Sequence, residues 1–219
     1  MKIVKGLSLF LLLAIVSLFT SRALRVPQLE LETLNASALL SYDPEFNYRQ
    51  TINDCGPFNT AAVVRVLKKD SIDSKNFAET IEWRLPNGYT LPWGLEKQLK
   101  ENEIETITPH LGSFSDQERV AYLKQELSKG SPIIILGGRD DYVGKNYEHY
   151  VTLLGFDSAE GLFYAYDPFF PTSTPGMTED ANGLAPGNRS YKTEVLLEFW
   201  EKGGVLGFYE WYALVAVGQ

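Results

Sequence analysis

The period of the apolar residues changes partway along the chain, and this change limits the folds available to it. Up to about residue 130, apolar side chains recur at the spacing of amphipathic helices. Beyond that point, short apolar runs rich in β-branched and aromatic residues predict strands. Helices followed by an antiparallel sheet indicate an α+β fold. The expected helices are 58–69, 73–83, 93–101, 115–129 and 193–202; the expected strands are 131–137, 150–157, 162–166 and one or two within 204–217.

The segments between these elements are expected to be loops and turns. Residues 24–48 are expected to be an extended lead-in, with a short helix near residues 31–40. Residues 158–161 have the composition of a hairpin turn that joins two antiparallel strands. Residues 168–190 are rich in Pro and Gly and are expected to form a long loop.

The first 23 residues have the pattern of a signal peptide. Lys2 and Lys5 provide a basic start, residues 6–20 an apolar run, and residues 21–23 the small side chains that a leader peptidase requires. The run is shorter than the roughly 20 apolar residues that span a bilayer, so we favour cleavage over a short membrane anchor. We therefore expect export, to the cell envelope or beyond it, and one domain over residues 24–219.

The net charge argues against two classes of partner. The leader holds three of the 20 basic residues and none of the 28 acidic ones, so the mature chain would carry a formal charge of −11. Nucleic acids and anionic membrane surfaces both require basic patches. We therefore expect no nucleic-acid partner, and no membrane contact beyond a possible N-terminal anchor.

Cys55 is the only cysteine of the chain, so it cannot form an intramolecular disulfide. It is a buried filler, an intermolecular link or a reactive thiol. It precedes Gly56-Pro57 and an apolar-periodic run, which puts it where a helix begins. The helix dipole and the free N–H groups of a first turn favour a thiolate at such a position. A catalytic thiol, however, also needs a base.

Only two histidines are available as that base. His149 lies at the start of an expected strand, a rigid place from which a side chain can face a cleft. His110 follows Pro109 in a loop with no matching set of residues nearby. His149 is therefore the better candidate.

Asp167 is the acidic residue expected beside His149. The hairpin turn at residues 158–161 makes residues near 149 and 167 cross-strand neighbours. A carboxylate at that point would fix the imidazole tautomer and stabilise the imidazolium. Each of the three residues, taken alone, has an ordinary structural explanation, and it is their coincidence that indicates a thiol site.

The blocks that contain these residues resemble a known family. QTINDCGPFNTAAVVRVL, EHYVTLLGFD and LFYAYDP, in this order, are similar to motifs of the papain-like cysteine peptidases of the bacteriocin-leader (double-glycine) peptidase-like family. TLPWGLEKQLKENEIE and LKQELSKGSPIIIL resemble the family's intervening segments, so the likeness covers roughly residues 48–170. It implies a papain-like fold, with N-terminal helices packed on a C-terminal antiparallel sheet, and no metal or organic cofactor.

The resemblance also implies roles for four residues. Cys55 would be the nucleophile, His149 the general base and acid, and Asp167 the orienting acid. Gln50 would donate its side-chain amide to the oxyanion hole, together with the backbone N–H of Cys55. Gln50 lies five residues before Cys55, whereas papain-like enzymes usually leave six, so Asn53 is an alternative donor.

The expected function is hydrolysis of a peptide amide bond in a peptide or protein substrate. Two alternatives remain open. One is a phytochelatin-synthase-like transpeptidase, although the chain lacks the extra cysteines of a metal-responsive region. The other is a non-catalytic peptide-binding module on the same scaffold. Double-glycine leader specificity does not follow, because the chain lacks the transporter segments to which true leader peptidases are often fused.

Overall fold

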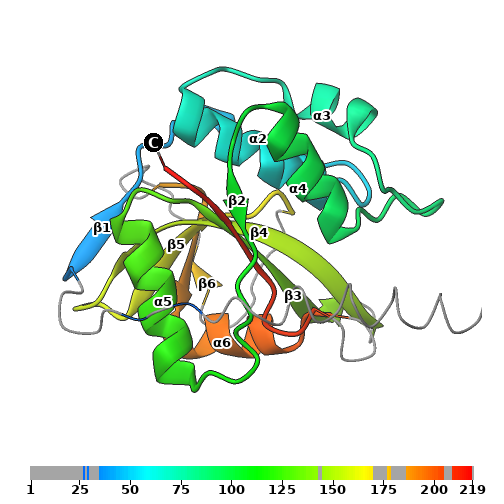
Figure 1. Cartoon of the computed structure of the whole chain (residues 1–219). Helices are drawn as coiled ribbons and strands as arrows, with labels where there is room; N and C mark the ends of the chain where they lie inside the picture. Colours follow the sequence, from blue (N-terminus) through cyan, green and yellow to red (C-terminus); the bar gives the residue numbers. More distant parts are fainter. Residues whose placement is uncertain are drawn as a thin grey trace, which may run out of the picture.

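The structure is a computed structural model, and it describes residues 27, 29, 35–142, 145–169, 177–178, 186–204 and 209–218. The expected leader, residues 1–23, lies outside this set. In chain order the described elements are β1 Ser37–Leu39, the 3-10 helix η2 Pro44–Phe46, α2 Cys55–Lys68, α3 Ser74–Thr80, α4 Pro92–Glu101, β2 Thr106–Ile107, α5 Asp116–Ser128, β3 Ile133–Tyr142, β4 Lys145–Asp157, β5 Leu162–Tyr166, β6 Met177–Thr178, β7 Arg189–Lys192, α6 Thr193–Glu201 and β8 Ala213–Ala216 (Figure 1).

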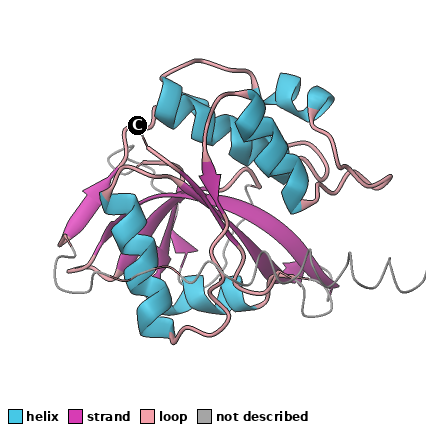
Figure 2. Cartoon of the chain, in the orientation of Figure 1, coloured by secondary structure: helices cyan, strands magenta, loops and turns pink. Residues whose placement is uncertain are grey.

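The strands form one antiparallel sheet in the order β2-β8-β3-β4-β5-β7-β6, and β1 pairs with β4 outside this path. β4 is the long central strand. It pairs with β3 along most of its length and with β5 near its end. Helices and an antiparallel sheet together make an α+β fold, and this prediction is confirmed (Figure 2).

Helices cover both faces of the sheet. Figure 1 shows α2, α3 and α4 on one face and α5 and α6 on the other. Successive residues of β3 alternate between them: Ile133 packs in the cluster with α5 and α6, and Ile134 in the cluster with α2 and α4. This alternation follows from the period of two in a strand, and it explains why the run SPIIILG is apolar without interruption.

Local sequence signals fix where several helices begin. α5 starts with a capping box, in which the Ser115 side chain accepts from the Glu118 N–H and the Glu118 carboxylate accepts from the Ser115 N–H. Pro92 opens α4, where its missing N–H costs nothing. The N-cap of α2, Asp54, makes no side-chain capping bond, because its carboxylate is engaged elsewhere.

Several local expectations were wrong, because strand pairing overrides local pattern. Residues 37–39, expected in a short helix, form β1, which pairs with β4 beyond the end of β3; residues 31–34 lie outside the described set. The segment expected to be a loop over residues 168–190 contains β6 and the start of β7, which extend the sheet past β5. β2 was not predicted at all, and β3 and β4 form a longer hairpin than expected. The closing stretch holds one described strand, β8.

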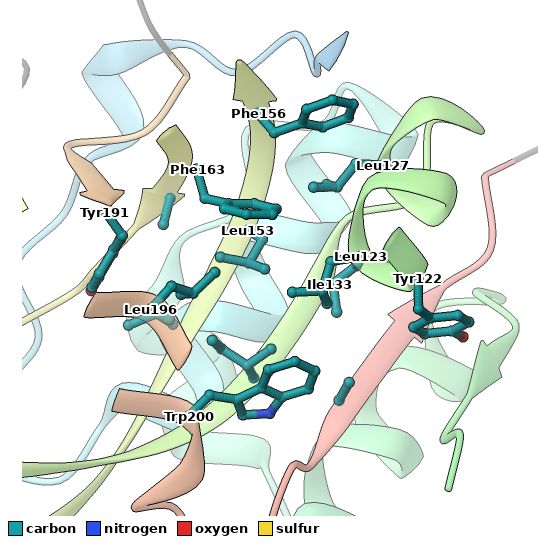
Figure 3. Packing of buried hydrophobic residues seen from close by; sticks show 14 of the residues in the cluster. Tyr122, Leu123, Leu127, Ile133, Leu153, Phe156, Phe163, Tyr191, Leu196 and Trp200 are labelled. Carbon is teal, nitrogen blue, oxygen red and sulfur yellow. The ribbon is translucent and has the colours of Figure 1, made fainter. Parts of the chain in front are cut away.

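Trp200 is the largest fully buried side chain, and its loss should be costly. It lies in α6 within the cluster of Figure 3 and donates its indole N–H to the Tyr212 carbonyl at 2.7 Å. We expect Trp200→Ala to lower the free energy of unfolding by about 3–5 kcal/mol, because it leaves a cavity and an unpaired carbonyl. Urea unfolding measures this change. Trp83→Ala is the control: Trp83 is 55% exposed, so its loss should cost less than about 1 kcal/mol. Equal losses of stability in the two variants would show that the buried Trp200 contributes no more than an exposed tryptophan.

Candidate active site

His149 and Asp167 form a buried hydrogen-bonded pair. His149 lies in β4, and Asp167 directly follows β5. The His149 Nε2 atom is 2.8 Å from Oδ1 of Asp167, and both side chains are buried. An ionised carboxylate only accepts hydrogen bonds, so the ring N–H is the donor.

A β-bulge determines how the two side chains meet. Tyr166 pairs with Thr152, and the pairing between β4 and β5 shifts register at Leu154. Continued by one residue, this register brings Asp167 beside Val151. The carboxylate therefore reaches His149 diagonally, along one face of the sheet, rather than from directly opposite.

The pKa of His149 is raised well above its ordinary value. Burial by itself lowers this pKa, because the charged ring loses its solvation. The charge and hydrogen bond of Asp167 act in the other direction, as do the hydrogen bond and charge of Cys55. Together they raise the pKa of His149 from 6.5 to about 9. The imidazolium is therefore the main form of His149 at neutral pH.

Cys55 is the first residue of α2, and its side chain is buried. It lies close enough to the His149 ring to help raise the pKa of His149. Because Asp167 occupies Nε2, Nδ1 is the ring nitrogen left for the thiol. The structure thus brings Cys55, His149 and Asp167 together, in that order of contact.

Residues from the β6–β7 region hold Asp167 in place. The Asn188 side chain makes two hydrogen bonds to the backbone of Asp167. Its Oδ1 atom accepts from the Asp167 N–H, and its Nδ2 atom donates to the Asp167 carbonyl, each at 2.8 Å. The Phe169 N–H donates to Oδ1 at 2.8 Å. The Tyr191 hydroxyl lies 3.5 Å and the Arg189 Nε atom 3.9 Å from Oδ2. No sequence pattern pointed to Asn188, Arg189 or Tyr191, because they meet Asp167 only when β7 pairs with β5.

Two aromatic rings enclose His149. Phe169 and Phe199 make edge-to-face contacts with the imidazole, with ring centroids 6.0 and 6.5 Å away. Gly137 is the β3 partner of His149, and a Cβ atom there would come within 2.3 Å of the Phe199 ring. The glycine is therefore required for Phe199 to approach. Both rings thus lie against the buried His149 side chain.

Gln50 approaches the pair from the segment before α2. Its backbone N–H donates to the Pro168 carbonyl at 2.8 Å, one residue beyond Asp167. Its Oε1 atom is buried and has no hydrogen-bond partner within the described part of the chain. With Oε1 turned inward, Nε2 is the end of the amide that remains for another acceptor.

Asn53, the alternative donor, is engaged away from the thiol. Its Nδ2 atom donates to the Asn87 carbonyl at 2.6 Å, and its backbone is left-handed, with φ 61°. Asn is one of the few residues with a side chain that adopts this conformation readily. Asn53 therefore ties the loop before α2 to the loop that contains Asn87.

A second contact closes the same loop. Oδ1 of Asp54 accepts a hydrogen bond from Arg84 Nη2 at 2.6 Å, and Oδ2 accepts one from Thr51 Oγ1. Arg84 also donates to the Gly88 carbonyl. The short connection of four residues between Gln50 and Cys55 is thus held by a charged pair, and not by a side-chain cap on α2.

Other kinds of site find no support in the described residues. His110 is exposed in the loop that precedes α5. No group of three His, Cys, Asp or Glu side chains within the described ranges is arranged to hold a metal ion. Among the described helices, none has the length and apolar character needed to cross a membrane.

The chain was compared with curated proteins, with solved structures and with protein families. No curated protein matches the chain. Among solved structures, the chain is similar to xylellain, a cysteine protease from Xylella fastidiosa, at 12% sequence identity and a TM-score of 0.46. That match covers 89% of this chain and 91% of the other.

The family comparison is decisive. The sequence model of the Peptidase_C39 like family matches residues 40–195, which is more than half of the 219 residues. The matched range includes the helix that begins at Cys55 and the β4–β5 hairpin. The resemblance inferred from the sequence is confirmed, and the chain belongs to the Peptidase_C39-like family of cysteine peptidases.

Proposed function

We propose that the chain hydrolyses peptide bonds with Cys55 as nucleophile, His149 as general base and acid, and Asp167 as the group that orients and charges His149. The observation that carries this proposal is the buried 2.8 Å contact between His149 and Asp167, with the Cys55 side chain near enough to the same imidazole to help raise its pKa. A nucleophile beside a base that a third group orients is the arrangement that acyl transfer requires.

The first half of the reaction makes an acyl-enzyme. The Cys55 thiolate attacks the scissile carbonyl carbon, a C–S bond forms, and the carbonyl electron pair moves to oxygen. The oxyanion is stabilised by the Cys55 backbone N–H and the Gln50 side-chain amide. As the C–N bond breaks, His149 gives its proton to the leaving amine.

The second half releases the acid product. A water molecule attacks the thioester carbonyl and loses its proton to His149. The C–S bond breaks and the thiolate returns beside the imidazolium. This ion pair is favoured by the raised pKa of His149, about 9.

Exposed apolar side chains near Cys55 fit a peptide substrate. Ile52 lies in the loop before Cys55 and is 86% exposed. Trp83 and Trp93 are also exposed, and their ring centroids are 5.8 Å apart. Arg84, the neighbour of Trp83, bonds to Asp54. We propose that this surface receives apolar side chains that flank the scissile bond.

Export is the second part of the proposal. The basic start, the apolar run and the small residues of positions 1–23 support a leader that is removed. N-terminal sequencing of the protein from an envelope or extracellular fraction checks this. A mature chain that still begins at Met1 would contradict removal.

A peptide library derived from a whole proteome tests the activity, because the substrate sequence is unknown. The purified protein should create new peptide termini, enriched in apolar residues near the cleaved bond. Alkylation with iodoacetamide should stop the reaction with one adduct per chain, since Cys55 is the only cysteine. Added glutathione distinguishes a transpeptidase, which would give glutathione-capped products. A folded protein that makes no new termini would instead support the binding module.

A further inference from the structure

Asn59 joins the helix of Cys55 to the strand of His149. It lies in α2, one turn beyond Cys55, and is fully buried. Its Nδ2 group donates to the Cys55 carbonyl at 2.8 Å and to the Tyr150 carbonyl at 2.7 Å. Its Oδ1 atom accepts from Thr152 Oγ1 at 2.6 Å. Both ends of the amide are therefore in use.

These contacts lie where β5 stops pairing with β4, while β3 remains paired with the other edge of β4. The pairing of β4 with β5 ends at Thr152, opposite Tyr166. Beyond that point, toward His149, the Tyr150 carbonyl receives the Asn59 amide. One NH₂ group thus bridges the carbonyl of Cys55 and the carbonyl of the residue that follows His149.

We infer that Asn59 is a positioning residue, which sets the distance and orientation of Cys55 relative to His149. The inference rests on the proposed function, because it concerns the geometry of the same thiol and imidazole. A side chain with two fixed acceptors on two elements holds their relative position more narrowly than apolar packing does. Small misplacements of reacting groups cost large factors in rate.

The test replaces Asn59 by a residue with the same branching at Cγ that forms no side-chain hydrogen bonds, Asn59→Leu. We expect kcat to fall by about 10–100-fold with KM within about two-fold of wild type, since substrate contacts are untouched. The alkaline limb of the pH–rate profile should move to lower pH, because a displaced thiolate supports the imidazolium less. Loss of stability alone would not move this limb.

Thr60→Val is the matched control. Thr60 is the next residue of α2, is equally buried, and donates to Pro57 O and Gln98 Oε1 on the side of α4. It should lower the melting temperature without moving the pH profile. Should Asn59→Leu fail to fold, Thr152→Val removes the hydroxyl that donates to Oδ1 of Asn59 and also lies 3.4 Å from the Asn59 carbonyl. Both donations of the Asn59 amide remain in this variant, so it should give a smaller loss, about 3–10-fold, in the same direction.

Two results would overturn the inference. One is an Asn59→Leu or Thr152→Val protein with wild-type kcat and pH profile. The other is Thr60→Val with the same loss of kcat and the same shift of the limb. If wild type hydrolyses nothing, the proposed function fails. The pH profile of Cys55 alkylation then tests whether Asn59 positions Cys55 relative to His149. A profile altered by Asn59→Leu and not by Thr60→Val then sustains the inference, and an unaltered one refutes it.

Discussion

Replacement of Cys55 by alanine is expected to abolish peptide hydrolysis, with a rate at least about 10³-fold below that of wild type. The chain has one thiol, so no other sulfur can form the acyl-enzyme. The side chain is small and lies in a buried cluster with Ala61 and Tyr150, so the fold should survive its truncation. Cleavage of the peptide library, or of a peptide chosen from it, measures the effect.

Binding separates loss of chemistry from loss of structure in this variant. Cys55→Ala should bind the chosen peptide with an affinity close to that of wild type, measured by calorimetry, because the exposed residues near the thiol are unchanged. Cys55→Ser should also be inactive, since a hydroxyl is a much weaker nucleophile beside the same base. Hydrolysis by Cys55→Ala at more than a few per cent of the wild-type rate would refute the thiol mechanism.

The candidate site was predictable from sequence to the extent that it depends on scarcity and on short-range pairing. One cysteine and two histidines left few combinations, and the position of the hairpin turn was enough to relate His149 to Asp167. The bulge at Leu154 was not predicted, although Gly155 directly beside it is a residue type that often marks a bulge inside a strand.

Contacts between distant segments could not be predicted in this way. Asn59 meets Tyr150 and Thr152 across 91 and 93 residues, and Asn188 meets Asp167 across 21. An isolated Asn in a helix or a loop has no periodicity to reveal its partner. The fold class followed from the change of period, whereas β1, β2, β6 and β7 are short strands stabilised by pairing rather than by their own sequences.

Substitution of Asp167 by asparagine should lower kcat/KM by about 10²–10⁴-fold and move the alkaline limb of the pH–rate profile to lower pH. In wild type, activity should fall as pH passes about 9, where His149 loses its proton. The negative charge of the Asp167 carboxylate raises the pKa of His149 in wild type. Asparagine keeps the shape of the side chain but removes this charge. Burial, which lowers that pKa, remains. The limb should therefore shift down by about one pH unit or more.

Glu160→Gln is the matched control for this change. It removes one negative charge from the same hairpin, at an exposed turn position with no contact to His149 described. Its profile should coincide with that of wild type. An Asp167→Asn protein that keeps its alkaline limb near pH 9 would show that a group other than Asp167 raises the pKa of His149. The substitution also affects the buried Arg189, whose Nε atom lies 3.9 Å from Oδ2 of Asp167. Since Asp167 and Arg189 are both buried, removing the carboxylate takes a negative charge away from Arg189 and can lower stability. The melting temperature must therefore be measured together with the rate. A limb shift at temperatures well below melting assigns the effect to His149 rather than to unfolding.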